Sequence, residues 1–374
     1  TILGDLDSDK IYGGSYDGST HTDDGIDTVD YSYLTDTTAI DVDLSLDDGD
    51  NTTNSEEEIK EIGNASNSDS VEGIENVIAT KNDDKLKGSD DFNEVNVLDG
   101  YKGDDSFIAS KGVDSFLGGD GVDTVDFSSI DLTGDGNAVI VDLGLEQASN
   151  DGYENAGNAV VDTLEDIEVV IGTTGDDQLT GSSEANTLVG NAGEDTLKGL
   201  AGEDLLQGGD NDDSIYGGDA LDTLEGGAGN DVLQGGNGND SIIAGAGDDI
   251  LEQLEGAGND TIDAGTGNDL IYGSTGDDEI TGGDNSDTLT YEQITSNPVE
   301  VNLGSGVSGD FGTVINGGDT DTLKDHIEII KGSTQGDKII GYDGTDENFD
   351  YDDTLYGLGS DDSIYGGIGD DTLY

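Results

Sequence analysis

The amino-acid sequence predicts an all-β fold, a parallel β-roll or β-helix solenoid in which short strands stack coil upon coil. Three observations predict it: a nine-residue period, an aspartate at one fixed place in each period, and a Leu or Ile two residues later. Self-similarity at a fixed short period is typical of solenoids, because each repeat adds one small unit to a stack. The 62 glycines and the single proline suit the tight turns of such coils.

The period is clearest over residues 172–290, where thirteen units follow one another with one two-residue slip near Gln253 and Leu254. The sixth residues of these units are Asp177, Asn186, Asp195, Asp204, Asp213, Asp222, Asp231, Asp240, Asp249, Asp260, Asp269, Asp278 and Asp287. Asp and Gly also favour ordinary turns, so the alternative is that these residues only form turns. A fixed place in unit after unit, beside the same glycines, favours a shared ligand role.

Residues seven to nine of each unit predict a three-residue strand, such as 241–243. Only the middle side chain faces inward, because side chains alternate along a strand. One aliphatic side chain per unit makes a thin core. Stability must therefore come from neighbouring coils, stacked at roughly 4.8 Å, and from ions held between the turns.

The charge of the chain predicts those ions. Eighty-eight acidic residues face eleven basic ones, and the formal net charge is -77. Two carboxylates about 5 Å apart repel by roughly 3 kcal/mol at an effective dielectric near 20, so a stack of them requires bound cations. The chain has no Cys and only His21 and His326, whereas oxygen ligands are in excess. This donor set favours hard cations, chiefly calcium, over zinc or copper.

The units resemble the pattern G-G-x-G-x-D-x-U-x of the RTX family, the hemolysin-type calcium-binding nonapeptide repeat. The resemblance implies many bound Ca²⁺ ions, two nonapeptides per coil and two ladders of ligands. One ladder would hold Asp177, Asp195, Asp213, Asp231 and Asp249, and the other Asp204, Asp222, Asp240 and Asn186. Because Asn186 lacks a charge, its site is expected to be the weak one.

Backbone carbonyls are the second kind of ligand that the resemblance implies. They are expected from the fourth residues of the units, Gly193, Gly202, Gly229, Gly238 and Gly247. Asn211 and Ala220 replace glycine at the same place in two units, so an altered turn is expected there.

Further copies of the repeat lie outside the regular stretch, among irregular neighbours. The metal ligands expected there are Asp9, Asp27, Asp84, Asp105, Asp114, Asp123, Asp337, Asp353, Asp362 and Asp371.

A longer module recurs three times between the repeats. Its copies begin GIDTVDYS at residue 25, GVDTVDFS at 121 and SDTLTYEQ at 286, and each ends by leading into a nonapeptide. Alternation of apolar and acidic residues over 40–44 predicts a strand with one buried face, and residues 74–78 predict a strand that returns to the roll. These modules are expected to be larger β coils inserted in the solenoid, with projecting loops such as 45–70.

The repeats and modules divide the chain into seven expected segments. They are partial repeats over 1–24, module one over 25–81, a short repeat tract over 82–124, module two over 125–171, the regular β-roll over 172–290, module three over 291–331 and C-terminal repeats over 332–374.

Tyr31, Phe127 and Tyr291 occupy equivalent places in the three modules. An aromatic at a fixed strand position predicts a core residue, and stacking against sugars is the alternative. His326 has no partner constellation and is interpreted as incidental. The best candidates for partner contacts are the projecting loops.

Two catalytic motifs, those of zinc proteases and of lipases, are missing from the sequence, whereas paired acids that acid–base catalysis could use are common. It contains neither HExxH nor GxSxG, and uniform turns do not offer two carboxylates in contrasting environments. No apolar run could span a bilayer, and no basic segment suits nucleic acid. We therefore expect no enzyme, no membrane span and no nucleic-acid partner. With neither a Met nor a signal-peptide pattern, the chain is expected to be a mature product or an internal piece of a larger protein.

The favoured hypothesis for function is a non-catalytic calcium-binding repeat region of a secreted protein at the bacterial cell surface, such as an adhesin, S-layer or fibrous coat. The resemblance implies export by a type I machinery and folding on meeting extracellular calcium. The expected partners are calcium ions, with self-association into a surface layer or fibre, or cell-surface glycans, as further hypotheses. The alternative is the secretion and folding domain of an exoenzyme whose catalytic domain lies outside this chain. A third hypothesis places catalysis or ligand binding on a projecting loop.

Overall fold

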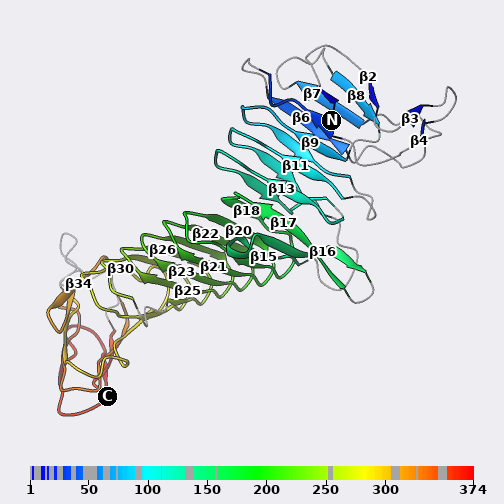
Figure 1. Ribbon diagram of the computed structural model, residues 1–374. Coiled ribbons are helices and arrows are strands. Elements are labelled where there is room, and N and C mark those ends of the chain that lie inside the picture. The colour runs from blue at the N-terminus through cyan, green and yellow to red at the C-terminus, as the bar shows by residue number, and fades with distance from the viewer. Residues whose placement is uncertain are drawn as a thin grey trace. The chain divides into compact units, whose positions relative to one another are not determined.

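A computed structural model gives the fold of the 374-residue chain. It describes residues 28–34, 39–44, 75–89, 95–110, 112–130, 138–155, 158–251, 256–304, 312–325, 327–343 and 352–374, and the backbone of six further short strands before residue 73. Two compact units form, one over residues 1–182 with 187–190, and one over 183–186 with 191–374. Figure 1 shows short strands that follow one another in successive coils.

The first unit contains two parallel stacks of strands that the chain visits in turn. One sheet contains β1 (Ile2–Leu3), β5 (Thr28–Asp30), β9 (Asn76–Ile78), β11 (Val97–Asp99), β13 (Ser115–Leu117), β15 (Ile140–Asp142), β16 (Gln147–Asn155), β17 (Asn158–Glu165) and β19 (Gln178–Thr180). The opposite sheet contains β2 (Lys10–Tyr12), β6 (Ile40–Asp43), β7 (Glu57–Glu61), β8 (Ser68–Glu72), β10 (Lys85–Lys87), β12 (Ser106–Ile108), β14 (Thr124–Asp126), β18 (Val169–Ile171) and the start of β20 (Thr187–Ala192). A small hairpin joins β3 (Ser15–Tyr16) to β4 (His21–Thr22).

The second unit repeats this plan. One sheet contains β21 (Thr196–Ala201), β23 (Ser214–Asp219), β25 (Val232–Asn237), β27 (Ile250–Leu251), β29 (Leu270–Tyr272), β31 (Thr288–Thr290), β35 (Ile329–Lys331), β37 (Thr354–Tyr356) and β39 (Thr372–Leu373). The opposite sheet contains β22 (Leu205–Asp210), β24 (Thr223–Ala228), β26 (Ser241–Ala246), β28 (Thr261–Thr266), β30 (Glu279–Thr281), β32 (Val299–Asn302), β33 (Thr313–Asn316), β34 (Asp319–Leu323), β36 (Lys338–Ile340) and β38 (Ser363–Tyr365).

Strand pairing confirms the predicted all-β parallel roll. Strands two repeats apart pair in parallel and in register, as in Leu197 opposite Ile215 and Leu206 opposite Leu224. Side chains of the eighth residues point between the two sheets, where Leu197, Leu206 and Leu233 have no exposed surface. In this part of the roll the strands are six residues long rather than three, because the ladder continues through the first three residues of the next repeat.

Each module contains an antiparallel excursion within one sheet. In the second unit β30 pairs with β34, β34 and β33 run antiparallel, β33 and β32 run antiparallel, and β32 pairs in parallel with β36. Meanwhile β31 and β35 of the opposite sheet are direct neighbours. The same arrangement joins β2, β8, β7, β6 and β10, and joins β13, β17, β16, β15 and β19. A module therefore adds three strands to one sheet. In the first copy the sequence predicted only β6 of these three, because the other predicted strand is β9 of the opposite sheet. The expected projecting loop over 45–70 instead contains β7 and most of β8.

One 3₁₀ turn, η2 (Leu143–Leu145), follows β15 in the second module. Within the described residues no helix is long and apolar enough to cross a membrane.

Candidate metal centres

The sixth residues of successive coils form two ladders in the second unit. The backbone N–H of each donates to the Oδ1 of its counterpart one coil further on, for example Asp195 to Asp213 and Asp213 to Asp231, both at 2.8 Å. The other ladder links Asn186 to Asp204 at 2.7 Å and Asp204 to Asp222 at 2.9 Å. The structure thus places Asp195 to Asp249 in one series and Asn186 to Asp240 in the other, as the resemblance implied.

The ladders continue across the two-residue slip. Asp240 donates to Asp260 and Asp249 donates to Asp269, both at 2.8 Å and both over 20 residues instead of 18. Neither ladder is interrupted at the slip.

The second oxygen of many of these carboxylates is buried without a hydrogen-bond partner. Among the described residues this holds for Oδ2 of Asp105, Asp123, Asp204, Asp213, Asp222, Asp231, Asp240, Asp249, Asp269 and Asp287. A buried charge without a partner is strongly unfavourable, and buried charges are normally paired or bound to a metal. These ten oxygens therefore indicate cation-binding sites; we call the ten turns that contain them the open turns.

The surroundings of these oxygens fit calcium. A Cβ atom placed on Gly208 would lie 2.3 Å from Oδ2 of Asp213 and 2.8 Å from the carbonyl oxygen of Gly226. Gly217 has the same relation to Asp222 and to the carbonyl of Gly235. Carboxylate and carbonyl oxygens from adjacent coils thus surround a space that only glycine leaves clear, and calcium prefers such oxygen ligands.

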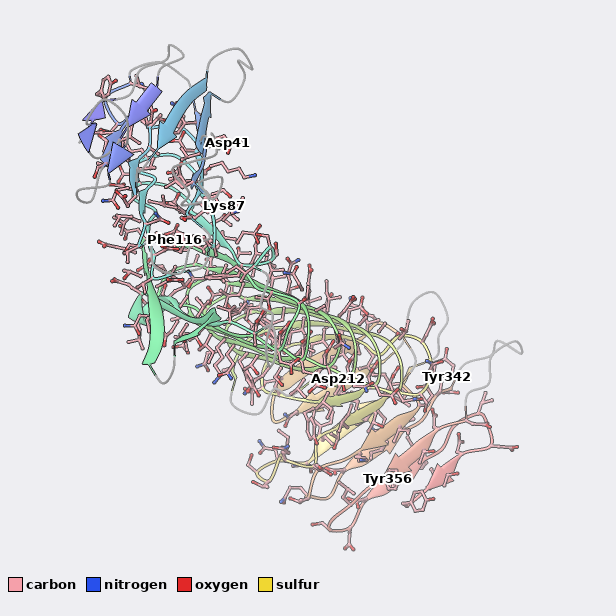
Figure 2. All side chains as sticks on the ribbon, turned by 90° about the vertical axis from the view of Figure 1, so that its right-hand side faces the viewer. Asp41, Lys87, Phe116, Asp212, Tyr342 and Tyr356 are labelled. Carbon is pink, nitrogen blue, oxygen red and sulfur yellow. The ribbon has the colours of Figure 1, made fainter. Side chains whose placement is uncertain are left out.

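A cation in these turns would be held largely by backbone carbonyls. No group of three or more His, Cys, Asp or Glu side chains in the described parts of the chain could hold a metal by side chains alone. Each open turn instead offers one carboxylate beside its turn carbonyls. Figure 2 shows the oxygen-tipped side chains that project all along the coils.

Burial raises the pKa of these carboxyl groups. Burial is the largest cause in Asp213, Asp222 and Asp249, whose pKa values rise to about 7, and neighbouring carboxylates raise them further. The N–H bond from the preceding coil opposes the rise. Burial raises the pKa of Asp105 in the first unit to about 8. Without a cation, the coils hold these groups in a setting that disfavours their charge.

The fourth residues of the units adopt the left-handed backbone conformation that glycine favours. The φ angles of Gly193, Gly202, Gly229, Gly238 and Gly247 lie between 119° and 148°. Asn211 and Ala220 adopt positive φ as well, 83° and 100°, so the altered turn expected at these two residues is not found. The turn is imposed by the neighbouring coils, since Ala220 N donates to the carbonyl of Asn237 at 2.8 Å. That the carbonyls of these residues bind calcium stays a prediction.

In the first unit the ladders end on residues of the modules. Asp84 donates to Asp105, Asp105 to Asp123 and Asp123 to Oε2 of Glu168, at 2.7 to 2.8 Å. The other ladder runs from Asn96 through Asp114 to Asp162. In the second unit Asp278 donates to Asp321 and Asp287 donates to Glu328.

The sequence predictions did not include Asp162, Glu168, Asp321 and Glu328. A signal was present, because the segments that begin at Asp162 and Asp321 share the order Asp-Thr-Leu, followed by a Glu four residues after the Leu in one and five residues after it in the other. These acids stand outside the nonapeptide period, and so the period alone could not assign them.

Six predicted ligands have their second oxygen occupied by hydrogen bonds. In five turns the hydroxyl of the second residue donates to the carboxylate at 2.7 to 2.9 Å: Thr80 to Asp84, Ser110 to Asp114, Thr173 to Asp177, Ser274 to Asp278 and Ser333 to Asp337. The sixth repeat is longer: it begins at Gly341, and its second residue, Tyr342, precedes Asp353 by 11 residues and donates its N–H to Oδ2 of Asp353 at 2.7 Å. We call these six the sealed turns.

The C-terminal repeats form the same type of ladder. Asp337 donates to Asp362 at 2.9 Å and Asp353 donates to Asp371 at 3.0 Å. Asp9, Asp27 and His326 lie outside the described residues.

Asp and Asn side chains at the fifth position form a further ladder that the sequence predictions did not include. Asn230 N donates to Oδ1 of Asp212 at 2.7 Å, and Asp248 N donates to Oδ1 of Asn230 at 2.8 Å. Here the donor lies in the later coil, whereas in the sixth-position ladder it lies in the earlier coil. Where both bonds form, the fifth and sixth residues thus join two coils by hydrogen bonds of opposite direction.

The three equivalent aromatic residues of the modules are core residues. Tyr31, Phe127 and Tyr291 are buried. The hydroxyl of Tyr291 donates to Oδ2 of Asp321 at 2.6 Å. Burial raises the pKa of Asp321 to about 7, and the hydrogen bond from Tyr291 opposes that rise.

Comparison with protein-family models matches one family, described as the RTX calcium-binding nonapeptide repeat. The matched residues are 92–125, 163–197, 171–206, 189–224, 216–251, 256–289 and 348–374. No curated protein matches the chain. The matched segments contain all ten open turns.

Proposed function

Because the chain carries RTX calcium-binding nonapeptide repeats stacked as a parallel β-roll, we propose that it is a non-catalytic structural repeat region of a secreted bacterial cell-surface protein. An adhesin, an S-layer or a fibrous coat is the kind of protein that such a region suits. The region is unfolded at cytosolic calcium and folds on meeting extracellular calcium.

The buried unpartnered oxygens of the open turns support this proposal. They recur along the ladders every 18 residues, or 20 across the slip. The RTX repeats bind calcium, and extracellular calcium modules commonly have dissociation constants of about 10⁻⁴ to 10⁻³ M. A site filled at ten times its dissociation constant adds roughly 1.4 kcal/mol to stability. Ten such sites together would decide whether the roll is folded.

An alternative role is the secretion and folding domain of an exoenzyme. The same calcium-dependent folding supports it, because a chain that stays unfolded before export and folds afterwards serves either protein. The two roles differ in what the folded roll does next, either joining other copies or remaining a monomer beside a catalytic domain.

A calcium titration of the whole chain tests the proposal. Circular dichroism and light scattering are recorded from excess chelator to about 10 mM calcium, a range that includes the affinities of extracellular sites. We expect a cooperative gain of β signal that chelator reverses. A β signal that persists unchanged in excess chelator would contradict calcium-dependent folding.

Light scattering in the same titration separates the two roles. Ordered growth in particle size after folding supports a self-assembling surface region. A folded, monodisperse monomer across the range supports the secretion domain instead.

A further inference from the structure

We propose that the chain contains two kinds of turn, open turns that bind calcium and sealed turns that do not, and that the second residue of the repeat decides between them. In a sealed turn a hydroxyl or N–H of the chain takes the place of the ion beside the carboxylate. This inference rests on the calcium binding proposed above and assigns it residue by residue.

The backbone at the second position separates the two kinds without exception. In all ten open turns this residue has positive φ: Tyr101, Gly119, Leu200, Gly209, Gly218, Gly227, Gly236, Gly245, Gly265 and Gly283. In the six sealed turns Thr80, Ser110, Thr173, Ser274, Ser333 and Tyr342 are not among the residues with positive φ. The left-handed conformation accordingly accompanies an unpartnered Oδ2.

The residue types follow most of this difference: eight of the ten open turns have Gly at the second place, whereas five of the six sealed turns have Ser or Thr. Thr is β-branched and enters the left-handed region rarely, whereas Gly does so without strain. At negative φ the N–H of Thr173 donates to Oδ2 of Asp177 at 2.6 Å, and its Oγ1 donates to Oδ1 at 2.9 Å. The same pair of bonds joins Ser333 to Asp337, at 2.6 and 2.8 Å. These donors compete for the lone pairs that a cation needs.

Five of the sealed turns lie where the roll meets a module. Asp84, Asp177 and Asp337 follow the modules. The Oδ1 of each accepts a backbone N–H at or next to the start of a module strand, β6, β15 or β32. The donors are Ile40, Val139 and Val299, at 2.6 to 2.8 Å. Asp114 and Asp278 precede modules, and each donates to a module acid, Asp162 or Asp321. The modules are thus joined to the roll by hydrogen bonds between groups of the protein.

In module three, too, a side-chain hydroxyl takes the place of an ion beside a ladder carboxylate. The carboxylate of Asp321 continues the ladder from Asp278, and the Tyr291 hydroxyl occupies its Oδ2. Gly273 makes room for that ring, since a Cβ there would lie 2.1 Å from a ring carbon of Tyr291. A donor of the protein again replaces the ion.

A matched pair of substitutions in the full chain tests the inference, Asp231→Asn in an open turn and Asp177→Asn in a sealed turn. Bound calcium per chain is measured by equilibrium dialysis with atomic spectroscopy at saturating calcium, and circular dichroism verifies the fold. We expect Asp231→Asn to bind at least one calcium fewer, or one calcium at least tenfold more weakly. Asp177→Asn should bind the wild-type number with an unchanged midpoint. An equal loss in both variants would overturn the inference.

Thr173→Gly supplies the converse test and does not remove a carboxylate. A glycine there permits the left-handed conformation and frees Oδ2 of Asp177, beside the carbonyls of Val189 and Gly190. We expect one additional calcium per chain; an unchanged number would contradict the role of the second residue. Wild-type protein that binds no calcium would sink the proposed function itself, whereas an equal loss in D231N and D177N would sink only this inference.

Discussion

Leu200 and Ala220 stand in backbone conformations that their side chains disfavour. Their φ angles are 81° and 100°, at positions where most other repeats have glycine. We expect Leu200→Gly and Ala220→Gly each to stabilise the calcium-loaded roll by up to about 1 kcal/mol, since relief of roughly 1–2 kcal/mol of strain exceeds the entropic cost of glycine. Thermal unfolding at fixed calcium measures the change.

Gly218→Ala is the matched control for these two substitutions. Its φ is 125°, and an added Cβ would lie 2.1 Å from the carbonyl oxygen of Leu200. The control should lower the melting temperature. If L200G and A220G also lowered it, the strain assigned to these residues would be wrong.

The hydroxyl of Tyr291 stabilises module three through Asp321. Tyr291→Phe removes the 2.6 Å hydrogen bond and leaves a buried carboxyl without that donor, which typically costs about 1–3 kcal/mol. Urea unfolding at saturating calcium measures the loss. Tyr365→Phe, at a tyrosine that is 60% exposed, is the control and should leave stability within about 0.5 kcal/mol.

At the residue scale, the sequence identified the acids of the repeat but not their state. Asp213 and Asp177 occupy the same sixth place in the period, so their position alone does not distinguish them. The difference lies in the φ angle and the donors of the residue four places earlier, Gly209 or Thr173. A Ser or Thr at that place was visible in the sequence, but its meaning depends on a hydrogen bond that only the folded turn forms.

Each strand of the regular roll depends on its one buried aliphatic side chain. Leu224 in β24 has no exposed surface, so Leu224→Ala should destabilise the roll by about 2–5 kcal/mol through loss of burial and a residual cavity. Leu373 in β39 is 47% exposed, and Leu373→Ala should change stability by less than about 0.5 kcal/mol. Calorimetry at saturating calcium compares the two. Equal effects would mean that burial in this core is not what stabilises the strands.

The strands of the repeats were predictable and the excursions of the modules were only partly so. A Leu or Ile at a fixed place identifies a strand such as β24, because every stacked coil needs a buried aliphatic side chain at the same position. Strands β16 and β33 carry no such period, and their pairing is antiparallel. Their partners are set by tertiary contacts with β17 and β34, which alternation along the chain does not encode.

At the scale of the whole molecule, stability without calcium should depend on pH in a definite direction. Burial raises the pKa values of Asp213, Asp222 and Asp249 in the folded chain to about 7, from an ordinary value of 3.8. Between these values the folded chain binds protons that the unfolded chain has lost, so its stability falls as pH rises through this window. In calcium-stripped buffer the roll should therefore gain β signal as the pH is lowered from about 8 to about 5.

Calcium binding should show the opposite dependence. The carboxylates must be ionised to bind the ion, so the calcium midpoint should rise as pH falls toward 5. Circular dichroism over a grid of pH and calcium concentration checks both directions. A calcium-free roll that loses structure on acidification would contradict the pKa values assigned to the open turns.

Because the two ladders alternate along the chain, an even and an odd number of deleted repeats have different consequences. Consecutive repeats join opposite sheets, so Asp213 and Asp231 share a ladder from which Asp222 is excluded. Deleting residues 217–234 removes one complete coil and leaves every later repeat in its own ladder. Deleting only 217–225 would transfer every later repeat, and module three with them, to the opposite sheet. Length changes that preserve this protein therefore come in even numbers of repeats.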